Sequence, residues 1–276
     1  MRQPLARQSG GPGAAFVWIV WLASLLVACE AVPEVLRWTA GFAGNLLSAA
    51  AGNYSPSYAE KVDRLLAGIA QPETEVVNDS QESPLQLDIA LLRQTKGPAG
   101  NTTLEPIKDG DVLRDGRGDP EAGDRFRIVL RANLDCHVYV VGIDATGWVS
   151  PLFPGQHSSH QNPVAKDRSY EIPDEAWAFS LDENRGIEHV YFVASREPCA
   201  AVEAILREFE RVRPVLATVS ALVTEPAVVQ RGVDKIQTGS AILLQALSGQ
   251  KEITPVSFLA TAAGADLVVT RWFRHE

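Results

Sequence analysis

The chain has 276 residues, an apolar fraction of 46% and a formal net charge of −9. This apolar fraction is typical of a globular core, and the length suits one large domain or a domain with extensions. The negative charge argues against a nucleic-acid partner and against electrostatic binding to anionic lipid headgroups, because both need clustered Lys and Arg.

The first 28 residues have the layout of a secretory signal peptide. Arg2 and Arg7 precede an apolar run from Ala14 to Ala28, and no acidic residue lies among them. A membrane-spanning helix needs about 20 apolar residues, so this run is short for a span. Removing residues 1–28 would also remove the two arginines and lower the net charge to −11.

The apolar run ends at Leu26-Val27-Ala28-Cys29, which resembles the lipobox of bacterial lipoproteins. The resemblance implies cleavage after Ala28 and attachment of lipid to the Cys29 thiol. We therefore expect a protein of the cell envelope, anchored by lipid on Cys29 and facing the periplasm. The alternative is an uncleaved signal anchor, because only uncharged residues separate Arg7 from Glu30.

Residues 29–70 are predicted to form a helical, membrane-proximal segment. Apolar residues recur at helical spacing over 32–51, and a capping box at Ser57 and Glu60 predicts a second helix. Residues 71–84 carry four acidic side chains and no basic one, which indicates an exposed linker.

From Leu85 the apolar period changes from that of a helix to that of a strand. Alternation of apolar and polar residues, with Gly and Pro turns between short runs, predicts an antiparallel, immunoglobulin-like β-sandwich within residues 85–276. A helix after Pro198 and an ambiguous region over 215–262 suggest a C-terminal α/β extension, so the fold class is mainly β. The predicted strands span 85–91, 126–130, 137–143, 148–153, 176–181, 188–195 and 265–273.

Two cysteines remain besides Cys29. Cys136 and Cys199 flank the predicted strands 137–143 and 188–195, whose ends would meet if the strands were antiparallel neighbours. A disulfide there would stabilise the fold by up to ~4 kcal/mol in the chain-entropy model. The alternative is two buried thiols that behave as small apolar side chains.

The middle of the chain resembles a known bacterial family. The segments "GDRFRIVLRANLDCHVYVVGIDATGWVSPLFPG" and "YEIPDEAWAFSLDENRGIEHVYFVAS" are similar to the family catalogued as domain of unknown function 4384, over roughly residues 105–197. The resemblance implies a small all-β domain, often appended to proteases, kinases or cell-envelope proteins. It implies no established catalytic residue, and no kinase or peptidase motif accompanies it here.

Two polar clusters contain residue types that can bind metal ions. The acidic run over 115–124 lacks the EF-hand pattern, so turn formation by Asp and Gly explains it better than calcium binding. His157 and His160 lack the further ligands that zinc requires, which favours a polar loop. No metal and no cofactor are predicted.

Trp148, Phe153 and Trp177 could together form an aromatic platform for a small ligand or glycan, although buried aromatic residues more often belong to a core. No catalytic residue is predicted. We expect a non-catalytic, membrane-anchored lipoprotein acting as a protein-interaction or structural module with an envelope protein partner. The alternative is a binding protein for a small ligand or glycan, and a weaker one is an enzyme with an unrecognised site.

Overall fold

The computed structural model describes residues 83–96, 102–116, 123–155, 158–174, 177–182, 184–209, 226, 228–246 and 249–276. The predicted signal peptide, Cys29, the membrane-proximal helices and most of the acidic linker lie outside the described residues. Within the described part the protein is mainly β. The strands pair antiparallel, except that residues 112–113 run parallel to residues 274–275.

The first sheet is built around a long strand that pairs on both sides. This strand, β1, runs antiparallel to β4 along one side and to β14 and then β2 along the other. The strand order is β11-β14-β1-β4-β7, with β2 beside β1 and β8 beside β4. The bounds are β1 (Gln86–Lys96), β2 (Thr102–Ile107), β4 (Arg125–Ala132), β7 (Ser169–Ile172), β8 (Phe179–Ser180), β11 (Val233–Thr238) and β14 (Val256–Ala260).

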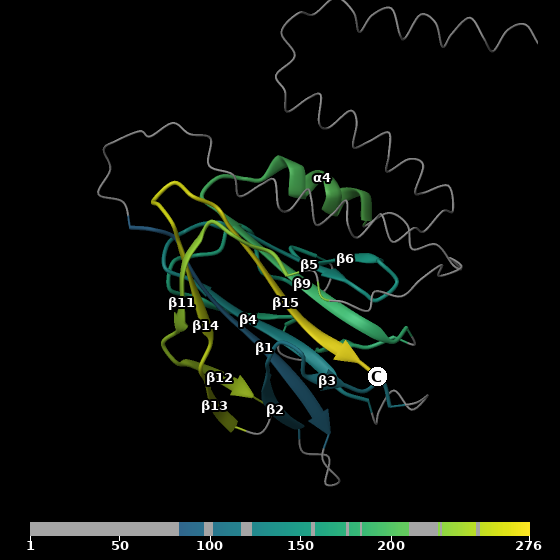
Figure 1. Cartoon of the computed structure of the whole chain (residues 1–276). Helices are drawn as coiled ribbons and strands as arrows, with labels where there is room; N and C mark the ends of the chain where they lie inside the picture. The colour runs from purple at the N-terminus through teal and green to yellow at the C-terminus, as the bar shows by residue number, and fades with distance from the viewer. Residues whose placement is uncertain are drawn as a thin grey trace, which may run out of the picture. The chain divides into compact units, whose positions relative to one another are not determined.

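The second sheet has its longest strands at its centre. Its order is β10-β15-β9-β5-β6, and β3 runs parallel to the end of β15. Figure 1 shows the two sheets as separate layers. The bounds are β3 (Val112–Leu113), β5 (His137–Ile143), β6 (Val149–Phe153), β9 (Gly186–Ser195), β10 (Gln230–Arg231) and β15 (Leu267–His275).

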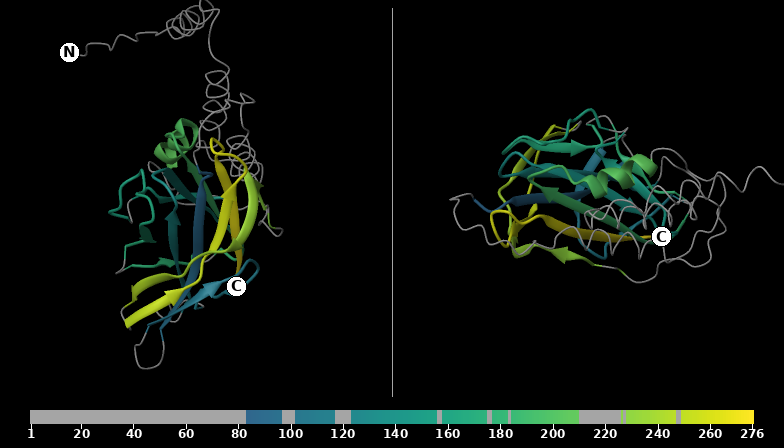
Figure 2. Two further views of the ribbon diagram at one scale, coloured as in Figure 1. Left: turned by 90° about the vertical axis from the view of Figure 1, so that its left-hand side faces the viewer. Right: turned by 90° about the horizontal axis from the view of Figure 1, so that it is seen from above.

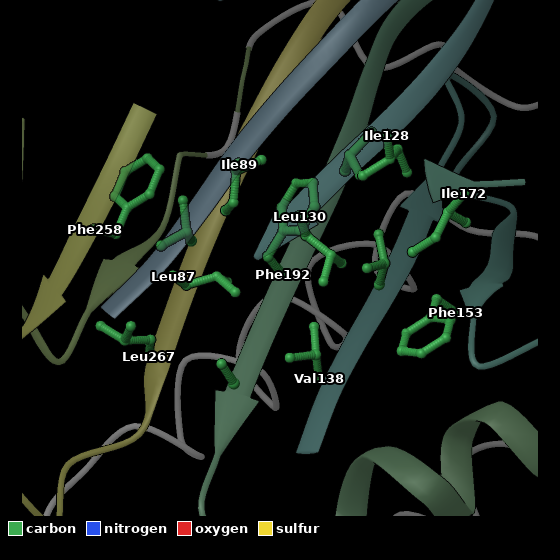
Figure 3. Packing of buried hydrophobic residues seen from close by; sticks show 14 of the residues in the cluster. Leu87, Ile89, Ile128, Leu130, Val138, Phe153, Ile172, Phe192, Phe258 and Leu267 are labelled. Carbon is green, nitrogen blue, oxygen red and sulfur yellow. The ribbon is translucent and has the colours of Figure 1, made fainter. Parts of the chain in front are cut away.

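The alternating apolar residues of both sheets meet in one core. Leu87 and Ile89 of β1 and Leu130 of β4 point toward Val138 and Phe192 of the second sheet (Figure 3), and all five are fully buried. Successive side chains of a strand leave on opposite faces, so the two-residue period of the sequence specifies which residues enter this layer. The predicted strands at 85–91, 126–130, 137–143, 148–153 and 188–195 all belong to it.

Each sheet is also covered on its outer face. The hairpin of β12 (Ile242–Ala246) and β13 (Gly249–Ile253) places buried apolar residues against Leu92, Leu104 and Val129 of the first sheet. Helix α4 (Ala200–Phe209) lies against the second sheet, where the Tyr139 hydroxyl donates to Glu203 Oε1 at 2.9 Å. Figure 2 shows α4 beside this sheet in both views.

The C-terminal part of the chain differs from the expected α/β extension. Strand β14 pairs directly with β1, and β15 pairs with β9 along nine residues near the centre of the second sheet. Strands β10, β11, β14 and β15 therefore belong to the two sheets instead of being appended to them. The sequence does not predict the place of β11, because β11 is an edge strand with residues exposed on both faces and therefore lacks the two-residue period of a half-buried strand. The predicted strand at 176–181 shortens to the two residues of β8.

The proposed disulfide does not form, since neither Cys136 nor Cys199 is in a disulfide bond. Cys136 lies in the core between the sheets, in line with Val138. The backbone N–H of Cys199 instead donates to the Tyr139 hydroxyl at 3.0 Å, on the opposite face of β5. The two strands are antiparallel neighbours as expected, with His137 opposite Ser195, but the two thiols belong to different faces of the sheet.

Candidate functional site

A cavity of about 810 Å³ opens at one end of the two sheets. It is lined by the start of β4 and by β8 on one side and by the start of β9 and the end of β15 on the other. The end of β5, the turn after it, strand β6 and the segment that follows β7 complete the lining. We call it the end cavity. Its lining combines five aromatic residues with three carboxylates, namely Phe126, Trp148, Trp177, Phe179, Phe273, Asp144, Asp182 and Glu188.

Three phenylalanines form the apolar wall of the end cavity. The ring centroids of Phe126 and Phe179 lie 5.1 Å apart, and those of Phe126 and Phe273 lie 5.3 Å apart. Phe126 of β4 and Phe179 of β8 lie opposite each other in the pairing of these two strands, while Phe273 comes from the second sheet. The wall therefore depends on pairing between strands and on packing between sheets.

Two of the three predicted platform residues lie at this cavity. Trp148 is half-buried, and Trp177 is 70% exposed. Phe153 is fully buried in the core and takes no part in the lining. The aromatic surface available to a ligand is thus the two tryptophans with the phenylalanine wall behind them.

A tight turn fixes Trp148 at the cavity. Asp144 Oδ1 accepts from the backbone N–H of Thr146 at 2.8 Å, from the Thr146 hydroxyl at 2.6 Å and from the backbone N–H of Trp148 at 2.9 Å. Gly147 has a φ of 79°, a conformation that glycine adopts without strain. The sequence alone does not indicate that the carboxylate of this turn lines a cavity.

Glu188 is the most strongly perturbed acid of the site. Its register partner is Phe273, and it precedes Val190 on the same face of β9, so its side chain points between the sheets. Burial raises the pKa of Glu188 to about 7, and the negative charges of Asp144 and Asp182 act in the same direction against the opposing effect of His275. The carboxyl group is thus poised to change charge near neutral pH.

A buried histidine lies next to this glutamate. His275 has no exposed side-chain surface, and its Nδ1 lies 3.6 Å from Glu188 Oε1. Its Nε2 lies 4.0 Å from Asp115 Oδ2, which in turn accepts from Arg185 at 3.0 Å. Burial lowers the pKa of His275, but the Glu188 carboxylate outweighs this effect and the net shift is upward.

The raised pKa of Glu188 gives a prediction for stability. The folded protein binds the proton of this carboxyl more tightly than the unfolded chain, whose pKa is about 4.5, so its contribution to stability falls as pH rises from about 4.5 to about 7. We expect the stability of Glu188→Gln, measured relative to the wild type, to be greater at pH 8 than at pH 5. Urea unfolding of both proteins at the two pH values measures this difference, and the same difference at both values would contradict the assignment.

The candidate metal residues lie elsewhere and have other contacts. Asp124 Oδ2 accepts from the backbone N–H of Arg114 at 2.9 Å, as expected of a turn. The Nε2 of His160 lies 3.8 Å from Asp174, whereas His157 lies outside the described residues. Among the residues that the structure describes, no group of three or more His, Cys, Asp or Glu could hold a metal ion. In the same part of the chain no helix is long and apolar enough to cross a membrane.

Comparison with known proteins supports the family resemblance. The model of the family "Domain of unknown function (DUF4384)" matches residues 121–198, which confirms the resemblance over that segment. The match begins later than the expected residue 105 and spans β4 to β9, which supply every named residue of the end cavity except Phe273. Neither the curated proteins nor the solved structures gave a match to this chain.

Proposed function

We propose that the protein is a non-catalytic lipoprotein of the bacterial cell envelope, tethered through Cys29, whose β-domain binds a small ligand in the end cavity. We further propose that the two sheets form an immunoglobulin-like sandwich and that helices within residues 29–70 connect it to the membrane. The antiparallel pairing of the sheets around one shared core supports this description of the domain.

One observation carries the ligand-binding proposal. The end cavity brings Trp148 and Trp177 together with Asp144, Asp182 and Glu188 from segments far apart in the sequence. Its volume falls within the range of small-molecule sites, which combine apolar walls with a few convergent polar groups. Trp177 is 70% exposed, and leaving this much apolar ring surface in water is unfavourable. The ring is therefore suited to cover a bound apolar group.

A thermal-shift screen of the full chain with small oligosaccharides, amines and organic acids tests this proposal. We expect at least one compound to raise the melting temperature of the wild type and to raise that of Trp177→Ala by much less. Leu243→Ala, which changes an exposed residue of β12 outside the cavity lining, serves as the matched control and should respond like the wild type. A panel without any active compound, or equal shifts in all three proteins, would count against ligand binding.

A protein-interaction module is the second candidate, and the edge of the first sheet favours it. Strand β11 ends the described strand order, and its Ile236 is 46% exposed. An edge strand with exposed apolar residues can pair with a strand of another protein. Affinity capture from solubilised envelopes with the wild type and Ile236→Glu tests this candidate, because a partner that binds at β11 should be lost only from the variant.

The proposed tether gives a separate prediction. Replacing Cys29 by Ser removes the thiol to which lipid would be attached, so we expect loss of radiolabelled palmitate from the protein and its release from the membrane fraction. Fractionation and labelling of the wild type and Cys29→Ser in a bacterial host measure both effects. Cys199→Ser is the control, since Cys199 belongs to the folded domain. An unlabelled wild type would show that the anchor is not a lipid.

A further inference from the structure

The electrostatic character of the end cavity indicates what kind of ligand it would accept. Three acidic side chains line it, and Asp144 and Asp182 both raise the pKa of Glu188, which means that the three carboxylates interact with one another. Hydrogen bonds satisfy part of this charge, since Asp182 accepts from the backbone N–H and the side-chain amide of Asn184 at 2.7 and 2.9 Å. These donors are neutral, and the lining as a whole holds three carboxylates against one arginine, Arg125.

The basic residues of the lining, Arg125 and His189, are fewer than its three carboxylates. Arg125 precedes Phe126 in β4, and since Phe126 faces the core, the Arg125 side chain leaves the strand on the opposite face. His189 likewise alternates with Glu188 in β9, and burial lowers its pKa to about 4, so it is neutral at pH 7. His275, which lies 3.6 Å from Glu188, and the Asp115–Arg185 pair are not part of the lining.

The aromatic residues point to the same class of ligand. A cation is attracted to the face of an aromatic ring, and tryptophan gives the strongest such contact. The phenylalanine wall formed by Phe126, Phe179 and Phe273 closes the cavity with apolar side chains, which a strongly hydrated metal ion would not favour. The cavity therefore offers negative charge beside aromatic faces and an apolar wall.

We infer that the end cavity binds an organic cation with an apolar body, such as a protonated amine on an aryl or alkyl group. The cationic group lies near Glu188, Asp144 and Asp182, and the apolar body packs between the phenylalanine wall and the two tryptophans. This inference rests on the proposed ligand-binding function and names the ligand class for that same cavity. A free amine and the side chain of a lysine share this chemistry.

A charge series of three similar molecules tests the inference. Phenethylammonium, 2-phenylethanol and 3-phenylpropionate carry a positive, a neutral and a negative group on the same ring, and tryptophan fluorescence of the full chain reports their binding. At pH 8 we expect phenethylammonium to bind roughly tenfold more tightly than 2-phenylethanol, with 3-phenylpropionate the weakest. At pH 5.5 the difference should shrink, because Glu188, whose pKa is about 7, is then mostly protonated.

Two variants and a control separate charge from apolar contact. Glu188→Gln should weaken phenethylammonium binding about fivefold without changing 2-phenylethanol binding, whereas Trp177→Ala should weaken both. Trp177 is largely exposed, so its replacement does not endanger the fold. Glu252→Gln removes an exposed carboxylate of β13 outside the lining and should leave binding unchanged. N-acetyl-lysine methylamide, compared with phenethylammonium, distinguishes a peptide side chain from a free amine.

The outcomes distinguish this inference from the broader proposal. Equal affinity for the ammonium and the alcohol would overturn the cationic class and leave ligand binding in the cavity standing. Failure of all three molecules to bind, while another compound of the thermal-shift panel binds in a Trp177-dependent way, would also overturn only the ligand class. Failure of the entire panel would overturn both.

Discussion

Phe192→Ala is expected to destabilise the folded protein by about 4 kcal/mol, since removing a fully buried phenylalanine leaves a cavity as well as losing apolar burial. Phe192 has no exposed surface, and in β9 it lies between Val140 of β5 and Val269 of β15. It faces the first sheet, so the cavity would lie between the layers, where few side chains can move to fill it (Figure 3).

Urea unfolding of the full chain measures this loss. Phe192→Leu keeps most of the volume and should cost less than half as much, and Val228→Ala, which changes an exposed residue, should cost under about 0.5 kcal/mol. A loss below about 1 kcal/mol for Phe192→Ala would show that the two sheets are not packed around this residue.

Arg131→Met is expected to cost about 3 kcal/mol, because it leaves the buried Asp88 carboxylate without its ionic partner. The Asp88 side chain is only 4% exposed, and Arg131 contacts its Oδ2 from Nη2 at 2.6 Å and from Nε at 3.1 Å. The same guanidinium donates to the carbonyl oxygen of Ser240 at 2.7 Å, so it also ties the segment before β12 to the first sheet.

A double variant tests the physical reason for this loss. In Asp88→Asn with Arg131→Met the buried group is neutral, and we expect more than half of the lost stability to return. Arg274→Met changes an exposed arginine of β15 and controls for the loss of a surface charge. Equal losses for the single and the double variant would show that the cost comes from lost packing or from Ser240 and not from an unpaired charge.

The sequence predicts the strands that have at least one apolar face, and it fails where both faces are polar or exposed. β1, β4, β5 and β9 alternate or are apolar throughout, and the structure contains all of them. β11 has five exposed residues out of six and gives no such period, so its place beside β14 could not be foreseen. Strand pairing depends on contacts between distant segments, which is why β15 was found as a strand but not as a central one.

The candidate site shows the same division. The residue types of Trp148 and Trp177 predict an aromatic platform, because aromatic rings often bind ligands, but the sequence does not show whether the rings are exposed. Nothing in the sequence connects Glu188 with Asp144 and Asp182, since only the pairing of β9 with β5 and β15 brings them to one end of the sheets. Phe153 belongs to the same core cluster as Phe126 and Phe273 but lies outside the cavity lining, a distinction that depends on the register of β6.

Ligand entry into the end cavity is tested most directly by the indole N–H resonances of the tryptophans in an NMR titration of the full chain with phenethylammonium. We expect the resonances of Trp148 and Trp177 to shift together and saturably at pH 8. Trp272 packs against Gly110 outside the lining, so its resonance should stay in place. Unchanged Trp148 and Trp177 resonances at millimolar ligand, or equal shifts of all three, would contradict binding in this cavity.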